Sequence, residues 1–104
     1  MDRPFIFSET AKMAWRQSQF RDGVSVKDLG TSDGQSMQLV RFEPGVQFPW
    51  HRHAGPEFIY VLEGEVTQRG WRLGPGDAGI APANTEEDDF FSEKEATFVL
   101  VYTD

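Results

Sequence analysis

Two histidines and one glutamate, closely spaced, are the residues best suited to do chemistry in this chain. His51 and His53 are the only histidines among 104 residues, and Glu57 follows His53 after three intervening residues. Residues two apart on a β-strand point to the same face, so both imidazoles would lie together. Two imidazole nitrogens and one carboxylate oxygen suit zinc, iron, manganese, nickel or copper. We therefore expect these three side chains to bind one divalent metal ion.

The rest of the composition narrows the chemistry further. The chain has no cysteine, so thiolate metal ligands and disulfides are excluded and any metal must be held by nitrogen and oxygen. No Ser-His-Asp triad can form without one of the two histidines, and no GxxxxGK phosphate loop occurs. Trp50, beside His51, is expected to pack rather than to bind the ion.

Short strands separated by glycine and proline are expected to position the metal ligands. Gly55-Pro56 ends the strand that carries the histidines, and Glu57 begins the next strand on the same face as Ile59 and Val61. Three stretches are especially rich in β-branched and aromatic residues, namely 37–43, 57–63 and 96–102. Many short strands at regular spacing predict an all-β sandwich or barrel.

Residues 58–62, with the sequence FIYVL, are apolar on both faces of their strand. Because a lone barrel would expose the outer face of this strand, another surface must cover it. We expect a homodimer, in which the N-terminal segment 1–18 packs on the partner. The alternative is that residues 1–20 fold back over their own barrel.

Length and charge set the class of protein. A chain of 104 residues has material for one domain, which we place at residues 1–104. Ten Lys and Arg against 17 Asp and Glu give a net charge of −7, which disfavours nucleic acid as a partner. No apolar run is long enough for a membrane span, and the N-terminus lacks a signal-peptide apolar region, so we expect a cytoplasmic protein without a membrane partner.

The segment around the histidines resembles the first motif of the cupin family. Its fixed positions are occupied by Gly45, His51, His53, Glu57 and Gly64. The chain is most similar to the cupin domain of ChrR-type zinc-dependent anti-sigma factors, through Trp15, Phe20, Gly23-Val24 and the segment LVRFEPGVQFPWHRHAGPEFIYVLEGE at 39–65. The resemblance implies a cupin barrel, also called a jelly roll or double-stranded β-helix, with the metal inside it. We expect no counterpart of the separate zinc-binding domain of those regulators in these residues, since they include no cysteine to build one.

A second cupin motif resembles the family from Gly76 to Pro82 but departs from it afterwards. Asn84 stands where the family usually has glycine, and Asn tolerates a left-handed backbone better than most residues. Glu87 stands where the fourth ligand histidine would fall. It lies in the acidic run 86–89, and such runs are usually solvated. The site therefore has either three protein ligands and open positions for water or substrate, or Glu87 as a fourth ligand.

Three functions remain open on the sequence. The first is a binding or sensing module, in which the metal organises a pocket for a small oxygen-bearing organic ligand. The second is a metal-dependent dioxygenase of a diketone-like substrate, because the similar small cupins include such enzymes. The third is a metal-free cupin that binds a sugar-like or apolar ligand. No catalytic residue is assigned apart from the metal ligands.

Overall fold

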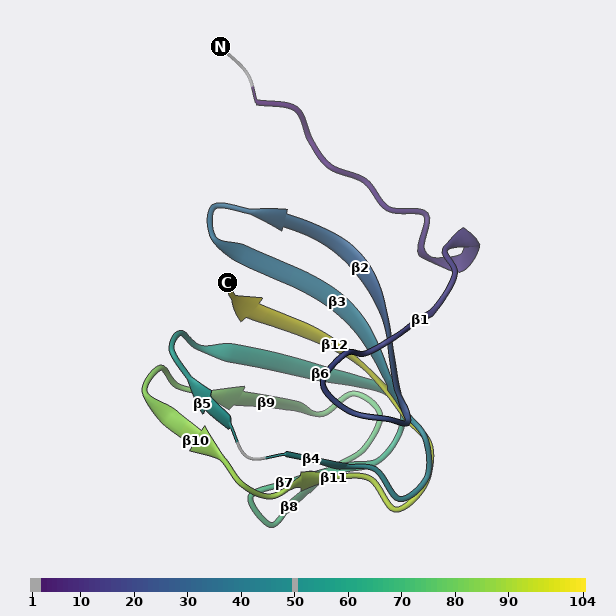
Figure 1. The fold of residues 1–104 in the computed structure, drawn as a ribbon, viewed down its shortest axis with the longest axis vertical. Helices are drawn as coiled ribbons and strands as arrows, with labels where there is room; N and C mark the ends of the chain where they lie inside the picture. Colours follow the sequence, from purple (N-terminus) through teal and green to yellow (C-terminus); the bar gives the residue numbers. More distant parts are fainter. Residues whose placement is uncertain (1–2, 50) are drawn as a thin grey trace.

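The computed structural model describes residues 3–49 and 51–104, so Trp50 lies outside the described residues. Antiparallel strands dominate the fold, with a single 3-10 turn, η1 (Thr10–Lys12), before the first strand described (Figure 1). The largest sheet has the order β1 (Arg16–Gln17), β2 (Val24–Ser32), β3 (Gln35–Phe42), β12 (Ala96–Thr103), β6 (Glu57–Gly64) and β9 (Ala78–Ala81). A second sheet has the order β4 (Gln47–Phe48), β11 (Phe90–Phe91), β7 (Val66–Gln68) and β8 (Trp71–Leu73). The smallest pairs β10 (Thr85–Glu87) with β5 (His51–His53).

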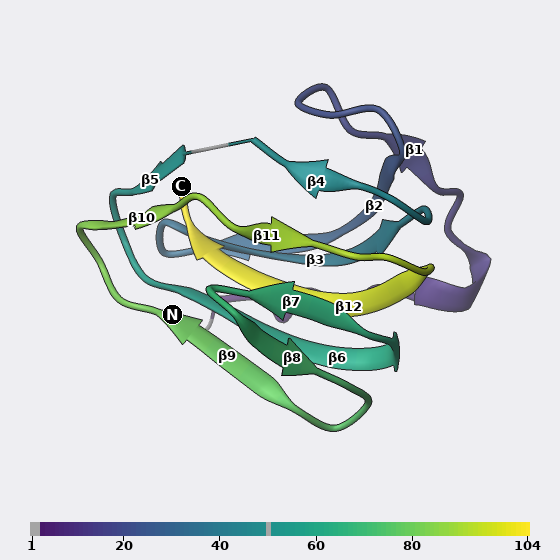
Figure 2. The same cartoon turned by 90° about the horizontal axis from the view of Figure 1, so that it is seen from below.

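The two larger sheets face each other and enclose an aromatic core (Figure 2). Phe42 lies at its centre. The centroid of its ring lies 5.1 Å from that of Phe98 and 5.2 Å from that of Phe90. Phe42 and Phe98 are each only 1% exposed. Tilted and edge-to-face aromatic contacts at these separations stabilise a core beyond the burial of their area. The rigid packing of these rings fixes how the two sheets face each other.

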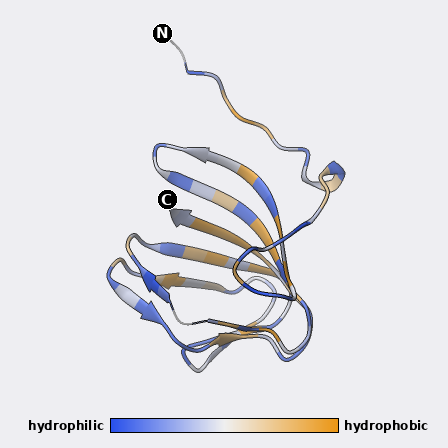
Figure 3. Ribbon diagram, viewed as in Figure 1, coloured by the Kyte–Doolittle hydropathy of each residue, from blue (hydrophilic) through white to orange (hydrophobic). Residues whose placement is uncertain are grey.

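The all-β prediction is confirmed. The strands predicted at 37–43, 57–63 and 96–102 are present as β3, β6 and β12, respectively. The alternation expected in β6 is also confirmed, because Ile59 and Val61 are buried whereas Phe58 and Tyr60 are 39% and 49% exposed. Apolar residues recur along the strands of the large sheet, while β5 and β10 carry hydrophilic ones (Figure 3). The small sheet is therefore the polar end of the molecule.

The N-terminal segment covers only part of the outer face of the large sheet. The Trp15 ring packs there, with Lys27 Nζ 4.8 Å and Arg41 Cζ 6.0 Å from its centroid. Lys27 Nζ also donates a hydrogen bond of 2.8 Å to the Thr10 carbonyl. Leu62 on β6 stays 44% exposed, so this segment does not cover β6. Among the described residues, no helix has the length and apolar character needed to cross a membrane.

Candidate metal site and cavity

The small sheet and the start of β6 bring the predicted ligands together. β5 and β10 pair antiparallel, with His51 opposite Glu87 and His53 opposite Thr85. The Nε2 atom of His53 lies 3.0 Å from Glu57 Oε2, and that of His51 lies 3.4 Å from the same oxygen. One ligand atom from each of these three residues lies within 4.8 Å of the others, so the group could hold a metal ion.

The turn before β10 depends on Asn84, whose φ is +64°. This value confirms the expectation that Asn84 tolerates a left-handed backbone where the family usually has glycine. The Asn84 backbone N–H donates a hydrogen bond of 2.8 Å to the His53 carbonyl. The turn thus sets the register that places Thr85 and Glu87 beside the histidines.

The environment of His53 leaves one ring nitrogen without a partner. The side chain is buried, and Nε2 has no hydrogen bond among the residues that the structure describes, since the nearby Glu57 oxygen lies outside hydrogen-bond geometry. Thr85 Oγ1 donates its proton to the Pro82 carbonyl at 2.6 Å and therefore accepts from His53 Nδ1, 3.3 Å away. Nδ1 then carries the ring proton, which leaves the Nε2 lone pair free. A divalent cation would satisfy this buried lone pair, so the residues fit a metal.

His51 is oriented in the same way by a different partner. Its Nδ1 lies 3.2 Å from the Pro49 carbonyl, and a carbonyl can only accept a hydrogen bond. Nδ1 is therefore the protonated nitrogen, and Nε2 faces Glu57. Interaction with the Glu57 carboxylate raises the pKa of His51 in the metal-free protein. The two imidazoles thus present their Nε2 atoms toward one shared carboxylate.

Glu87 is buried at the same site, unlike its neighbour in the acidic run. Its side chain is 2% exposed, with Oε2 3.5 Å from His53 Nε2. Gln68 donates a hydrogen bond of 3.2 Å to its other oxygen, and burial raises the pKa of Glu87. Glu86 is exposed and pairs with Arg52 at 3.8 Å. The expectation of a solvated run is therefore wrong at Glu87, because alternation along β10 turns this one carboxylate inward.

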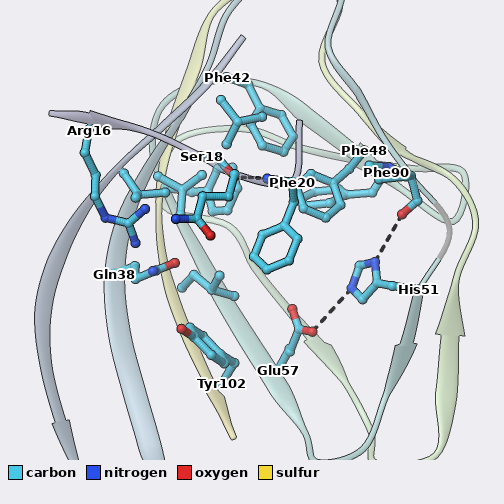
Figure 4. Close-up of a pocket in the computed structure, with 17 residues that line it drawn as sticks. Arg16, Ser18, Phe20, Gln38, Phe42, Phe48, His51, Glu57, Phe90 and Tyr102 are labelled. Carbon is cyan, nitrogen blue, oxygen red and sulfur yellow. Dashed lines mark hydrogen bonds and ion pairs between the residues drawn. The ribbon is translucent and has the colours of Figure 1, made fainter. Parts of the chain in front are cut away.

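A cavity of about 630 Å³ opens beside the metal site. His51 and Glu57 line it at one end, and Arg16 and Gln38 line it at the other end (Figure 4). Tyr102, which pairs with Glu57 across β12 and β6, lies between these ends. Its walls are mainly apolar and include Val40, Phe42, Phe48, Phe90, Phe98 and Leu100. Pockets of this size and character bind small organic molecules.

The polar side of the cavity away from the metal site was not predicted from the sequence. Arg16 donates hydrogen bonds of 2.6 and 2.9 Å to the two carboxylate oxygens of Asp28, and Gln38 donates one of 2.9 Å to Asp28 Oδ1. These residues come from β1, β2 and β3. The available signal was a polar residue, Gln38, at an inward position of β3, where it alternates with the buried Val40 and Phe42.

Comparison with known proteins agrees with this architecture. The family model described as "ChrR Cupin-like domain" matches residues 4–104. A search of curated proteins finds no match. Among solved structures, the acetylacetone dioxygenase from Acinetobacter johnsonii superposes with a TM-score of 0.81 at 18% identity, covering 99% of this chain and 78% of that one. An RmlC-like cupin from Shewanella frigidimarina gives a TM-score of 0.80 at 20% identity, with coverages of 99% and 94%.

A further similar structure is the complex of SigE with the anti-sigma ChrR from Rhodobacter sphaeroides. The TM-score is 0.73 at 28% identity, and the alignment covers 90% of this chain. The chain spans only 50% of the matched chain in that complex. These matches confirm the predicted cupin jelly-roll fold.

Proposed function

Because the chain belongs to the ChrR cupin-like family, we propose that it holds one divalent metal ion on His51, His53 and Glu57 and binds a small oxygen-bearing organic molecule beside that ion. The observation that carries this proposal is the buried Nε2 atom of His53, which has no hydrogen-bond partner among the described residues. Such an atom is costly unless a ligand satisfies it. The convergence of His51 and Glu57 on the same point supports an ion as that ligand.

We also propose Glu87 as a fourth ligand. Burying a carboxylate costs on the order of several kcal/mol unless it is paired and hydrogen-bonded. Gln68 supplies one neutral hydrogen-bond donor to Glu87, and His53 Nε2 carries no proton in the tautomer assigned above. A dication between two carboxylates and two neutral imidazoles would balance the charge of the site. The open-site alternative, with three protein ligands, predicts no role for Glu87 in binding.

The ion would act as a Lewis acid that attracts ligand oxygen atoms. His51 and Glu57 line the cavity, so a molecule in the cavity can reach the ion that they hold. In the binding and sensing role, the molecule occupies the cavity without being transformed. The similarity to a chain of the SigE–ChrR complex, at 28% identity, supports this regulatory role.

Metal analysis of protein purified without a histidine tag tests the metal site. We expect about one zinc or iron ion per chain after repletion with each metal, and loss of the ion in His51→Ala. Arg52→Ala is the matched control, because Arg52 lies between the histidines, points away from them and is exposed. Protein that takes up no metal after repletion, or a His51→Ala variant that retains the ion, would overturn the proposal.

A metal-dependent dioxygenase is the second candidate function. It is supported by the similarity in fold to the acetylacetone dioxygenase from Acinetobacter johnsonii and by a metal site that adjoins an organic-ligand cavity. Oxygen consumption by the iron-loaded protein with acetylacetone or its phenyl analogue decides between the roles. Uptake of oxygen in proportion to substrate lost supports the enzyme, whereas ligand binding without oxygen uptake supports the sensor.

We further propose that a second copy of the chain covers the outer face of the large sheet. Apolar side chains form a continuous stripe there across β3, β12, β6 and β9, as the register of these strands places them side by side. The stripe consists of Met37, Leu39, Val99, Val101, Phe58, Tyr60 and Ile80. Leu62, which is 44% exposed, follows Tyr60 on the same face of β6. Apolar surface gathered in this way is typical of an interface.

A further inference from the structure

The two ends of the cavity differ, and we propose that it selects an uncharged, largely apolar ligand with a hydrogen-bonding group at the end of Arg16 and Gln38. This inference deepens the proposed function, because the opposite end of the ligand would meet the metal ion near His51 and Glu57. The chemical class is thus a neutral aryl or alkyl molecule that carries polar groups at both ends.

The walls of the cavity exclude a sugar-like ligand. Phe42, Phe48, Phe90, Phe98 and Leu100 form much of the cavity wall and offer no hydrogen-bonding atom from their side chains. Each sugar hydroxyl buried against these walls would lose its hydrogen bonds to water without replacement. An aromatic ring or alkyl chain would instead gain from burial in the same space. The body of the ligand is therefore apolar.

The polar side is electrically neutral, although it contains an arginine. Both Asp28 oxygens accept hydrogen bonds from Arg16, and Oδ1 also accepts one from Gln38. The Arg16 charge is therefore already paired with Asp28, although both side chains are about half exposed. A ligand carboxylate would compete with Asp28 for the guanidinium and would also meet the negative charge of Glu57 across the cavity. A hydroxyl or carbonyl group avoids both costs and can bond to the Tyr102 hydroxyl or the Gln38 amide.

Phe20 lies at the entrance and would close over the body of the ligand. Its side chain is 80% exposed, yet it lines the cavity, and its ring lies between the two polar sides (Figure 4). The loop holds its shape through a hydrogen bond of 3.1 Å from the Phe20 backbone N–H to Ser18 Oγ. A bound apolar molecule would bury this ring, so Phe20 should contribute to affinity without being needed for folding.

A matched pair of probes tests the charge preference without any metal. At neutral pH 2-naphthol is uncharged and 2-naphthoate is an anion of similar shape. Calorimetric titration of the metal-free protein should show 2-naphthol binding at least about tenfold more tightly. Equal or tighter binding of 2-naphthoate, or no binding of 2-naphthol up to its solubility limit, would overturn the inference. Binding of glucose in preference to 2-naphthol would do the same.

Paired variants assign the binding to this cavity. Phe20→Ala should weaken 2-naphthol binding several-fold, whereas Phe7→Ala should not, because Phe7 is 85% exposed and lies outside the cavity. Tyr102→Phe should also weaken binding, whereas Tyr60→Phe, on the outer face of the sheet, should leave it unchanged. Equal effects within either pair would contradict the assignment.

The metal-loaded protein provides a second test of the apolar cavity. Benzohydroxamic and acetohydroxamic acids carry the same chelating group and differ in the apolar body, so the phenyl compound should bind at least about tenfold more tightly. Equal affinities would overturn the cavity inference even where metal binding is intact. Failure to bind metal would instead overturn the proposed function, and the naphthol comparison would still decide the nature of the cavity.

Discussion

At the residue scale, Thr85 determines what His53 can bind. The Thr85 hydroxyl has one proton, which it gives to the Pro82 carbonyl, so it can only accept from His53 Nδ1. This arrangement fixes the ring tautomer and aims a free lone pair from Nε2 into the site. Thr85 is therefore a positioning residue, which acts on the ion through His53.

Replacing Thr85 by valine should weaken metal affinity by about 10- to 100-fold, as expected for loss of a partner that orients a ligand. Thr85→Ser keeps the hydroxyl and should restore affinity close to that of the native chain. Calorimetric titration with zinc measures both variants, and circular dichroism checks that each is folded. A merely structural role would give similar affinities for the two folded variants.

Glu87 is the residue at which two models of the metal site differ. Glu87→Gln removes one negative charge from the proposed ligand set and should lower zinc affinity by about 100-fold. Glu86→Gln is the matched control, since Glu86 is exposed and lies one position away. Unchanged stoichiometric binding in Glu87→Gln would establish the three-ligand site instead.

Although Glu87→Gln should weaken zinc binding, it should stabilise the metal-free protein. Burial raises the pKa of Glu87, so the folded chain favours the protonated carboxyl and loses stability as the pH rises through that pKa. Glutamine removes this penalty. Without metal, Glu87→Gln should therefore have a free energy of unfolding about 1 kcal/mol higher than that of the native chain at neutral pH, measured by urea unfolding. The difference should disappear in acid.

At the element scale, the short strand β1 is held to the large sheet by Asp28. Hydrogen bonds from Arg16 and Gln38 lower the pKa of Asp28, so its ionised form stabilises the folded chain. This contribution is present above the unfolded pKa and is lost as the pH falls through the folded one. Because the pair is about half exposed, it contributes no more than about 1 kcal/mol.

Asp28→Asn should lower stability slightly at neutral pH and reduce the loss of stability between neutral and acidic pH. Urea unfolding at both pH values measures the change. Asp33→Asn is the control, because Asp33 forms an exposed ion pair with Arg3 and its positive φ suits asparagine. Identical pH profiles for Asp28→Asn and the native chain would show that the Arg16 pair does not hold β1.

The sequence predicted those strands and ligands that a pattern of residue types within a short stretch of the chain identifies. The strands β3, β6 and β12 were found because β-branched and aromatic residues fill them, and the ligands on β5 and β6 because a fixed spacing links them. β2 was not singled out, because Lys27, Asp28 and Gly30 interrupt its apolar pattern, with a register shift between Asp28 and Gly30. The inward turn of Glu87 and the Arg16–Asp28–Gln38 cluster depend on contacts between distant segments, which no local pattern contains.

At the scale of the whole molecule, the apolar outer stripe predicts a dimer. Phe58→Arg places a charge between Val101 and Ile80, in the middle of this stripe, and should shift the mass measured by light scattering from that of two chains to that of one. Trp71→Arg is the control, because Trp71 is 75% exposed but lies on β8 in the other sheet. A native chain with the mass of one copy at all concentrations tested would contradict the dimer.

The position of the metal ligands also affects how the molecule would come apart. His51 and Glu87 lie on the small sheet, whereas Glu57 begins β6, so one ion would cross-link segments far apart in a chain that has no disulfide. The Phe42–Phe98 core does not depend on this cross-link. Removing the ion should therefore loosen β5 and β10 first, and hydrogen exchange should rise there while β3 and β12 stay protected. A chelator would thus destabilise one end of the barrel and leave the rest folded. Equal loss of protection in all strands would show instead that the ion stabilises the entire fold.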